Sequence, residues 1–118
     1  MQKRERDALS PLMDTMRRRI DKAFSLAELA RMAAMSERTF IRRFKEATGT
    51  TPADWLTVIR LDRARELLES SSHSIDSIAE QTGFGTATTM RHHFRRKLGT
   101  NPTAYRSRFS VADSRRRH

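Results

Sequence analysis

The sequence has no cysteine and few residues that interrupt regular structure. Its 118 residues include 4 glycines and 3 prolines. Without cysteine there can be no disulfides or thiolate metal sites, so the chain needs no oxidising compartment. No apolar run is long enough for a membrane span or a signal peptide. These absences favour a cytoplasmic protein that does not enter a membrane.

The sequence also lacks the usual signatures of catalysis. It contains no Gly-rich phosphate loop, no nucleophile elbow and no isolated pair of carboxylates. His92 and His93 are adjacent and should diverge on a helix, while His73 lies in a serine-rich segment, so these residues do not have the spacing of a metal site. We therefore expect no enzymatic activity, no metal and no cofactor.

Acidic residues are outnumbered. Lys and Arg total 24 against 14 Asp and Glu, a formal net charge of +10. Such an excess favours a polyanionic partner, either nucleic acid or an acidic membrane surface. The length suits one compact unit or two very small units sharing a core, and one domain with an internal duplication is the simplest interpretation.

Two segments of the chain repeat one pattern. The first copy runs over residues 25–56 and the second over residues 74–106, with one residue inserted in the second. The matched positions are mostly apolar residues, Gly or Pro, so the repeat preserves a plan of packing and turns. The pairs are Leu26 with Ile75, Leu29 with Ile78, Ala30 with Ala79, Ala34 with Gly83, Met35 with Phe84, Phe44 with Phe94, Gly49 with Gly99, Thr50 with Thr100, Pro52 with Pro102, and Trp55 with Tyr105.

A long helix is predicted between the copies, over residues 51–70. Thr51 can cap it, Pro52 suits its first position, and Asp54 completes a capping box. Apolar residues then recur at spacings of three and four, which predicts one amphipathic helix without interruption. They are Trp55, Leu56, Ile59, Leu61, Ala64, Leu67 and Leu68.

The first copy predicts two short helices. Ser25 and Glu28 form a capping box for a helix that ends near Ala34, and Ser36 caps the next helix. A turn of residues 34–36 separates them. The second helix should bury Phe40 and Phe44, point its basic residues outward and end at Gly49. Two short helices around such a turn are the helix-turn-helix plan.

The second copy predicts the same arrangement. Gly83 occupies the position where a residue with positive φ would close the turn, and Gly85 or Thr86 caps the second helix. That helix should bury Met90 and Phe94.

Helices are also predicted at both ends. One begins at Ser10 and Pro11 and buries Leu12, Met16 and Ile20, and a short one begins at residues 101–102 and carries Tyr105 and Phe109. The expected fold is therefore all-α, with about seven helices in two homeodomain-like helix-turn-helix subdomains joined by a long central helix.

The charge is segregated between these helices. Residues 37–46 hold four basic and two acidic residues, or +2, and residues 85–98 hold four basic residues and no acid, or +4. Residues 53–69 hold three basic and four acidic residues, or −1. The two candidate recognition helices are basic and the helix between them is not, as expected for a nucleic-acid-binding protein.

Two tracts resemble the AraC/XylS family of transcription regulators. Residues 78–106, IAEQTGFGTATTMRHHFRRKLGTNPTAYR, are similar to the signature of the family's second helix-turn-helix, and residues 44–56, FKEATGTTPADWL, match it in the first copy. The resemblance covers about residues 12–109. It is strongest to the branch in which this DNA-binding domain follows an amidotransferase-like sensor domain, which is not within the 118 residues. An excised fragment and a naturally short regulator are both compatible with this.

The sequence pattern gives the expected domain limits, and the resemblance implies the site residues. Residues 10–109 are the expected DNA-binding domain, made of units 10–50 and 71–109 around linker helix 51–70; residues 1–9 are expected to be disordered, and residues 110–118 to be a loose basic tail. The base-reading positions are Ser36, Glu37, Arg38, Ile41 and Arg42 in the first copy and Thr86, Ala87, Thr88, Arg91 and His92 in the second.

The physical chemistry of these positions agrees in part. Arg38 and Arg42 are four residues apart, so they share a helix face, and Arg can donate two hydrogen bonds to guanine. The family often has Arg where this chain has His92, and imidazole is shorter and only partly charged near neutral pH. The remaining basic residues, Arg43, Arg95, Arg96 and Lys97, are expected to contact phosphate or solvent.

Two functions follow from this interpretation. The favoured one is sequence-specific binding of double-stranded DNA by a monomeric domain, at an asymmetric site of two boxes about one helical turn apart, with RNA polymerase as a further candidate partner. The alternative is a cationic helical adaptor for acidic protein or membrane surfaces. The aromatic residues could also form a stacking platform for single-stranded nucleic acid, but their helical spacing favours the core.

Overall fold

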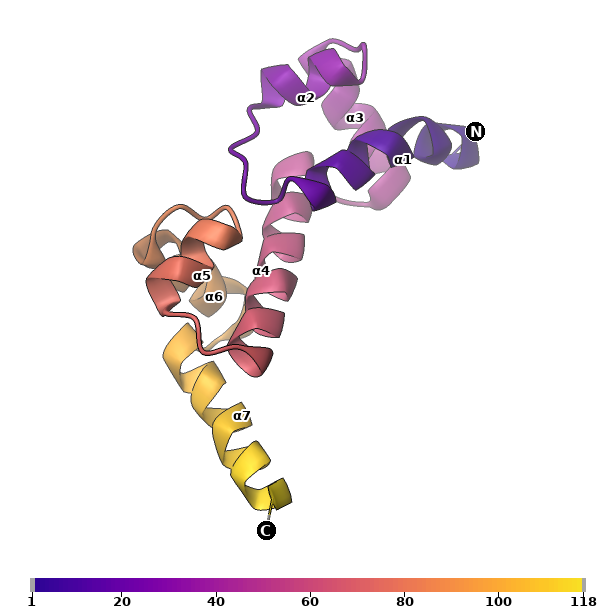
Figure 1. Cartoon of the computed structure of the whole chain (residues 1–118). Helices are drawn as coiled ribbons and strands as arrows, with labels where there is room; N and C mark the ends of the chain where they lie inside the picture. Colours follow the sequence, from indigo (N-terminus) through magenta and orange to yellow (C-terminus); the bar gives the residue numbers. More distant parts are fainter. Residues whose placement is uncertain (1, 118) are drawn as a thin grey trace. The chain divides into compact units, whose positions relative to one another are not determined.

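The computed structural model describes the backbone of residues 2–117 and the side chains of residues 8–109 (Figure 1). Within this part the chain is all-helical, as predicted. The helices are α1 Gln2–Arg18, α2 Leu26–Met32, α3 Glu37–Thr48, α4 Pro52–Ser70, α5 Ile75–Gln81, α6 Ala87–Leu98 and α7 Pro102–Arg117. The chain divides into two compact units, Met1–Ile59 and Arg60–His118, and the boundary falls inside α4.

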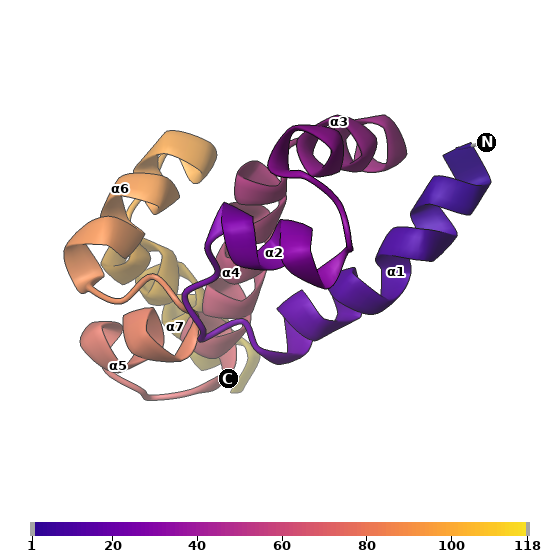
Figure 2. The same ribbon diagram turned by 90° about the horizontal axis from the view of Figure 1, so that it is seen from above.

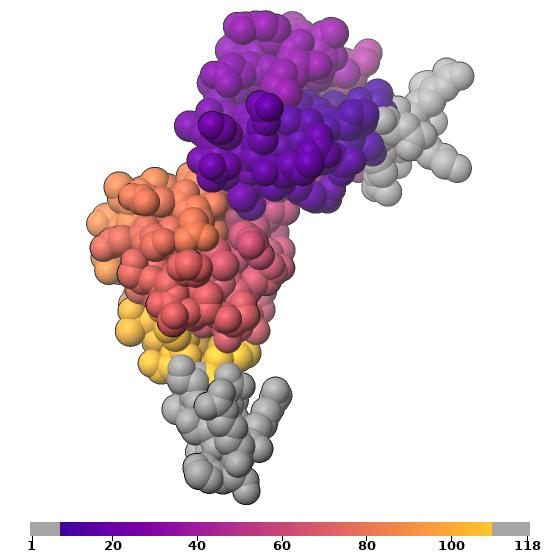
Figure 3. Space-filling model, in the orientation of Figure 1, coloured from indigo at the N-terminus to yellow at the C-terminus, as the bar shows by residue number. Residues whose placement is uncertain are grey.

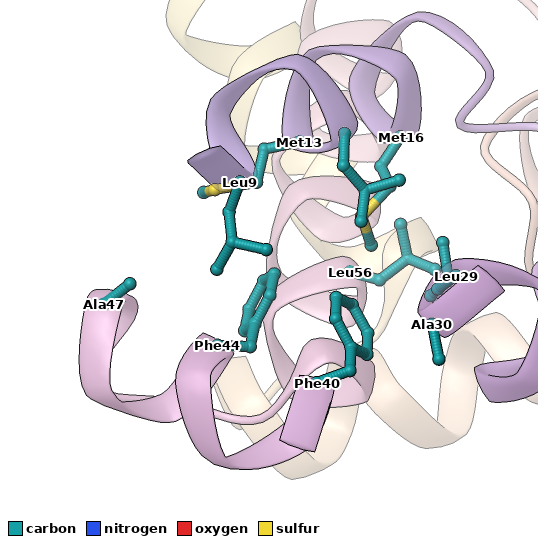
Figure 4. Close-up of a cluster of buried hydrophobic side chains, with 10 residues drawn as sticks. Leu9, Met13, Met16, Leu29, Ala30, Phe40, Phe44, Ala47 and Leu56 are labelled. Atoms are coloured by element: carbon teal, nitrogen blue, oxygen red, sulfur yellow. The ribbon is translucent and has the colours of Figure 1, made fainter. Parts of the chain in front are cut away.

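The core of the first unit is built around two phenylalanines of α3. Phe40 and Phe44 are completely buried, and their ring centroids lie 5.7 Å apart in an edge-to-face arrangement. Phe44 makes a second edge contact with Trp55 at 5.8 Å. Figure 4 shows both rings pointing towards Leu9, Met16 and other apolar side chains, and in Figure 3 the coloured side chains of the first unit form a continuous surface. These aromatic residues therefore belong to a core and not to a stacking platform.

Helix α1 begins earlier than the sequence indicated. The predicted start at Ser10 is wrong, because α1 continues through Pro11 and Leu9 is buried, with 1% of its surface exposed. Leu9, Leu12, Met13 and Met16 lie on one face and pack in the same cluster, and this burial outweighs the cost of a proline inside a helix. The disorder expected for residues 1–9 does not extend to Leu9, which is helical and buried, and the side chains of residues 1–7 lie outside the described part.

The turn between α2 and α3 is set by two backbone hydrogen bonds. The amide of Met35 donates to the carbonyl of Ala30 (2.9 Å), and the amide of Ala34 donates to that of Arg31 (3.0 Å). This pair defines a Schellman motif, in which the residue that donates the shorter-range bond is left-handed. Ala34 takes that conformation, with φ of 59°. Figure 2 shows α2 leading through this turn into α3.

The second unit repeats the turn with a residue better suited to it. The amide of Phe84 donates to the carbonyl of Ala79 (3.0 Å) and that of Gly83 to Glu80 (3.2 Å). Gly83 has φ of 86°, which confirms its predicted role. Behind the turn, Ile78, Met90 and Phe94 are completely buried.

The last helix is fastened to α4 by polar contacts as well as by packing. Arg65 Nε donates to the hydroxyl of Tyr105 (3.1 Å), which in turn donates to Glu69 (2.9 Å). Arg106 Nη2 donates to the carbonyl of Ser71 (3.2 Å), at the carboxyl end of α4. The final helix, α7, runs over Pro102–Arg117 and is longer than the short helix that the sequence predicted. The side chains of residues 110–118, where a loose tail was expected, lie outside the described part.

Helix α4 does not present the single apolar face that its spacing predicted. Leu56 is buried in the cluster of the first unit, while Leu61, Ala64, Leu67 and Leu68 are buried in that of the second. Val58, between these groups, is 44% exposed. The buried hydrophobic residues thus form one cluster in each unit, although the sequence had favoured one domain with an internal duplication.

Removing the central aromatic ring of the first unit should destabilise that unit, and no charge changes in the substitution. Phe44→Ala deletes a fully buried ring and is expected to lower the free energy of unfolding by about 3–5 kcal/mol. Arg42→Ala, on the exposed side of the same helix, should change it by less than about 0.5 kcal/mol. Urea unfolding followed by circular dichroism measures both. A stable Phe44→Ala variant would show that the ring is not a core element.

The two matched turns allow a reciprocal test. Ala34→Gly should raise the free energy of unfolding by about 0.5–1 kcal/mol, because relief of the left-handed strain outweighs the entropy that glycine adds to the unfolded chain. Gly83→Ala should lower it by about 1 kcal/mol or more. The same urea experiment applies, and stabilisation by Gly83→Ala would contradict the assignment of the turn.

Candidate nucleic-acid interface

In the first unit, the predicted residues gather on the solvent-facing side of α3. Phe40 and Phe44 are fixed in the core, and a helix turns by about 100° per residue, so Arg38 and Arg42 point away from it. Both are exposed, and Ile41 is half-buried beside them. Ser36 caps α3, its hydroxyl accepting a hydrogen bond from the amide of Thr39 (3.2 Å). Glu37 is exposed in the first turn.

The two adjacent arginines of α3 lie in different surroundings. Arg42 is exposed and its Nη1 lies 3.2 Å from Glu46 Oε1. Arg43 is half-buried, and its Nε is buried without a hydrogen-bond partner in the described part of the chain. Arg42 is therefore the more available of the two for a ligand. Glu46 was absent from the predicted site, although its spacing of four residues from Arg42 could have indicated the ion pair.

In the second unit, α6 presents a comparable surface. Its N-cap is Thr86, whose hydroxyl accepts a hydrogen bond from the amide of Thr89 (3.2 Å), so Thr86 and not Gly85 is the cap. The exposed face then carries the other predicted polar residues, which are Thr88, Arg91, His92, Arg95 and Arg96. Lys97 is exposed in the last turn, and α6 contains no acidic residue.

Ala87 is the predicted site residue that the structure places elsewhere. Only 6% of its surface is exposed. It precedes the buried residues Met90 and Phe94 by three and seven positions, so all three lie on the inner side of α6. With so little exposed surface, the methyl group of Ala87 is poorly placed to contact a base directly.

The two adjacent histidines of α6 also differ. His93 stacks on Phe84, with ring centroids 5.6 Å apart and planes 27° apart, and lies 5.4 Å from the ring of His92. Partial burial lowers the pKa of His93, and the positive charges of His92, Arg96, Lys97 and Arg60 lower it further. His93 thus acts as a packing residue that favours its neutral form. His92 is exposed, although the rings of the pair do not diverge as expected.

The helix between the candidate surfaces is electrically balanced. On α4, Arg63 Nη1 lies 2.8 Å from Glu66 and Arg65 Nη1 lies 3.6 Å from Asp62. The excess positive charge of residues 8–109 is therefore not spread evenly but is greatest on α6.

Among residues 8–109, no three acidic or histidine side chains converge in a way that could hold a metal, and no helix of the described part has the length and hydrophobicity to cross a bilayer.

Known proteins share this arrangement. The sequence model of a helix-turn-helix domain family matches residues 29–108. The chain is 39% identical to the HTH-type transcriptional regulator Rv1931c of Mycobacterium tuberculosis, over 91% of its own length and 41% of that protein. It is 36% identical to an AraC-like transcription regulator of Streptomyces antibioticus, over 71% of its length and 28% of the relative. The chain spans less than half the length of these curated relatives.

Solved structures show the same fold. The DNA-binding domain of the global transcriptional factor AdpA, in complex with a target DNA, superimposes with a TM-score of 0.85 at 38% identity, covering 88% of this chain and 94% of that domain. An AraC-type regulator from Chromobacterium violaceum gives 0.78 at 28% identity, covering 87% and 92%. One Schellman-type helix-turn-helix motif precedes the long helix α4 in the sequence and a second follows it, and the family match spans both, so this chain belongs to the AraC/XylS family of helix-turn-helix transcription regulators.

Proposed function

We propose that this chain binds double-stranded DNA in a sequence-specific manner, with α3 and α6 each entering a major groove. The observation that carries the proposal is that each unit fixes one side of a helix in an aromatic core and exposes a polar, basic side. An α-helix fits the major groove, where each base pair presents a distinct pattern of donors and acceptors. The likeness to the AdpA domain, which was solved with a target DNA, supports it.

The side chains divide into two chemical roles. Arg38 and Arg42 are long and exposed, and each can donate two hydrogen bonds to O6 and N7 of a guanine. Ser36 and Thr86 cap the two helices, whose amino ends carry partial positive charge and suit a phosphate. Thr88, Arg91 and His92 are the candidates for base contact in the second unit, and the remaining basic residues serve the backbone.

The wider context of the domain is also a proposal. In the cytoplasm, a regulator that carries this domain would act next to RNA polymerase, and the domain alone would bind as a monomer. A monomer could contact two boxes, since one chain carries two helix-turn-helix units and each presents one recognition helix.

Selection from a random duplex library at a stated salt concentration tests the function. A specific binder enriches one sequence and keeps it in the presence of excess unrelated DNA. A cationic adaptor would enrich nothing and would bind acidic vesicles or acidic proteins as well as DNA. That second outcome would overturn the proposal.

The form of the selected site is a separate prediction. Two recognition helices in one chain should protect two boxes on one face of the duplex, about 34 Å apart, which is one helical turn. The aligned recognition positions differ, for example Arg42 and His92, so the boxes should have different sequences. Footprinting of the selected site measures this. A single short box, or a perfect inverted repeat bound only by dimers, would contradict it.

The two units should contribute differently to binding. Arg38→Ala and Arg42→Ala should each flatten the preference at particular base pairs of one box, since a good bidentate pair discriminates by about 1–3 kcal/mol. Arg95→Ala and Lys97→Ala should weaken all duplexes alike and reduce the salt slope by about one. The first unit would then supply most of the discrimination, and the second mainly phosphate contact and fit to DNA shape.

Equilibrium binding of the four variants to the selected site and to a scrambled duplex, across salt, separates these effects. The assignment is wrong if the box read by α6 proves the less tolerant of base changes while the Arg42 variant still discriminates normally. In that case Thr86 and Thr88 would read bases by close approach.

A further inference from the structure

The contact between Arg42 and Glu46 has a feature that helix stability does not account for. Glu46 lies in the last turn of α3, which ends at Thr48. Negative charge is unfavourable there, because the carboxyl end of a helix already carries partial negative charge. The order is also the less favourable one, since an acid stabilises a helix best when it precedes its basic partner.

Glu46 is not needed for packing either. Its side chain is 43% exposed and that of Arg42 is 58% exposed, and neither belongs to the hydrophobic cluster of the first unit. What Glu46 does in the structure is accept a hydrogen bond from Arg42 Nη1 at 3.2 Å. An acid whose position costs helix stability, and whose partner is the exposed arginine of a candidate recognition helix, points to a role in recognition.

We propose that Glu46 is a positioning residue that directs Arg42 to a base and away from phosphate. This rests on the proposed function of α3. The guanidinium is a rigid plane with five N–H donors, so one contact at Nη1 orients the whole group. The edge formed by Nε and Nη2 is not used by that contact and has the spacing that O6 and N7 of guanine require.

The charge of Glu46 acts in the same direction. The carboxylate compensates the positive charge of Arg42 and repels phosphate oxygens, so the pair gains little from the DNA backbone. A guanine edge carries no net charge and does not incur this repulsion. The pair should therefore convert a general attraction for DNA into a preference for one base.

The second unit provides an internal comparison. With Phe44 aligned to Phe94, the positions of Arg42 and Glu46 correspond to His92 and Arg96. Helix α6 has no acid and carries Arg95, Arg96 and Lys97 in its last turn, which is the arrangement that the helix dipole favours. Glu46 therefore lies on α3, the helix of the proposed base-reading residues Arg38 and Arg42. Helix α6, which suits phosphate, has no acid at the matching position.

The test compares Glu46→Gln with a matched control in the full chain. Glu66→Gln removes the same charge from an Arg–Glu pair on α4, where Arg63 Nη1 lies 2.8 Å from Glu66 and both side chains are more than half exposed. Arg42→Ala and the double variant Arg42→Ala/Glu46→Gln complete a cycle. The probes are the duplex selected by the unmodified chain and a scrambled duplex, measured across salt, with thermal unfolding as a check on the fold.

Glu46→Gln should leave the melting temperature unchanged or slightly higher and lower the ratio of specific to scrambled affinity by about threefold to tenfold, within the discrimination that one bidentate arginine provides. Its affinity for the scrambled duplex should rise, with a salt slope larger by about one, because Arg42 becomes available to phosphate. Glu66→Gln should leave the ratio within twofold. The double variant should discriminate like Arg42→Ala.

Several outcomes would overturn the inference. One is a Glu46→Gln variant that keeps the discrimination of the unmodified chain while Arg42→Ala loses it; the proposed function would then stand. Another is a double variant that discriminates less than Arg42→Ala, because Glu46 would then contact a base itself, as a carboxylate can with the amino group of cytosine. If the unmodified chain selects no duplex, the proposed function fails together with this inference.

Discussion

The presentation of each candidate recognition helix depends on one backbone hydrogen bond that spans the turn before it. Met35 to Ala30 in the first unit and Phe84 to Ala79 in the second close the end of a short helix and fix the direction in which the chain leaves it. The side chains of Met35 and Phe84 then enter the hydrophobic cluster of their unit. A local turn and a tertiary contact therefore support each other, and the exposed faces of α3 and α6 are determined by both.

Much of the fold could be predicted because its signals are local. Ser36, Thr51 and Thr86 cap their helices through contacts within three residues, and such contacts are visible in sequence spacing. The start of α1 was missed because Ser10 and Pro11 form a local start signal, whereas the burial of Leu9 depends on residues far along the chain. The spacing of α4 suggested one face because periodicity does not reveal that successive turns pack in different cores.

Those site residues could be predicted whose exposure follows from the positions of the buried core residues on the same helix. Once Phe40 and Phe44 are buried, the exposure of Arg38 and Arg42 is a matter of helix geometry. Ala87 was assigned to the site by resemblance alone, whereas its spacing of three and seven residues from Met90 and Phe94 predicts a position on the buried side of α6. Glu46 entered the prediction only through the net charge of residues 37–46, and a net charge does not show which arginine an acid pairs with.

The division of α4 between two clusters has a consequence for how the domain folds. A new helix is costly to start, whereas extending an existing one adds a hydrogen bond for each residue fixed. When either unit has formed its cluster, it holds one half of α4 in helical form and supplies a ready nucleus for the other half. The two units can therefore assist each other's folding through the continuity of one backbone. A glycine at the exposed Val58 would weaken that cooperation while leaving both clusters intact.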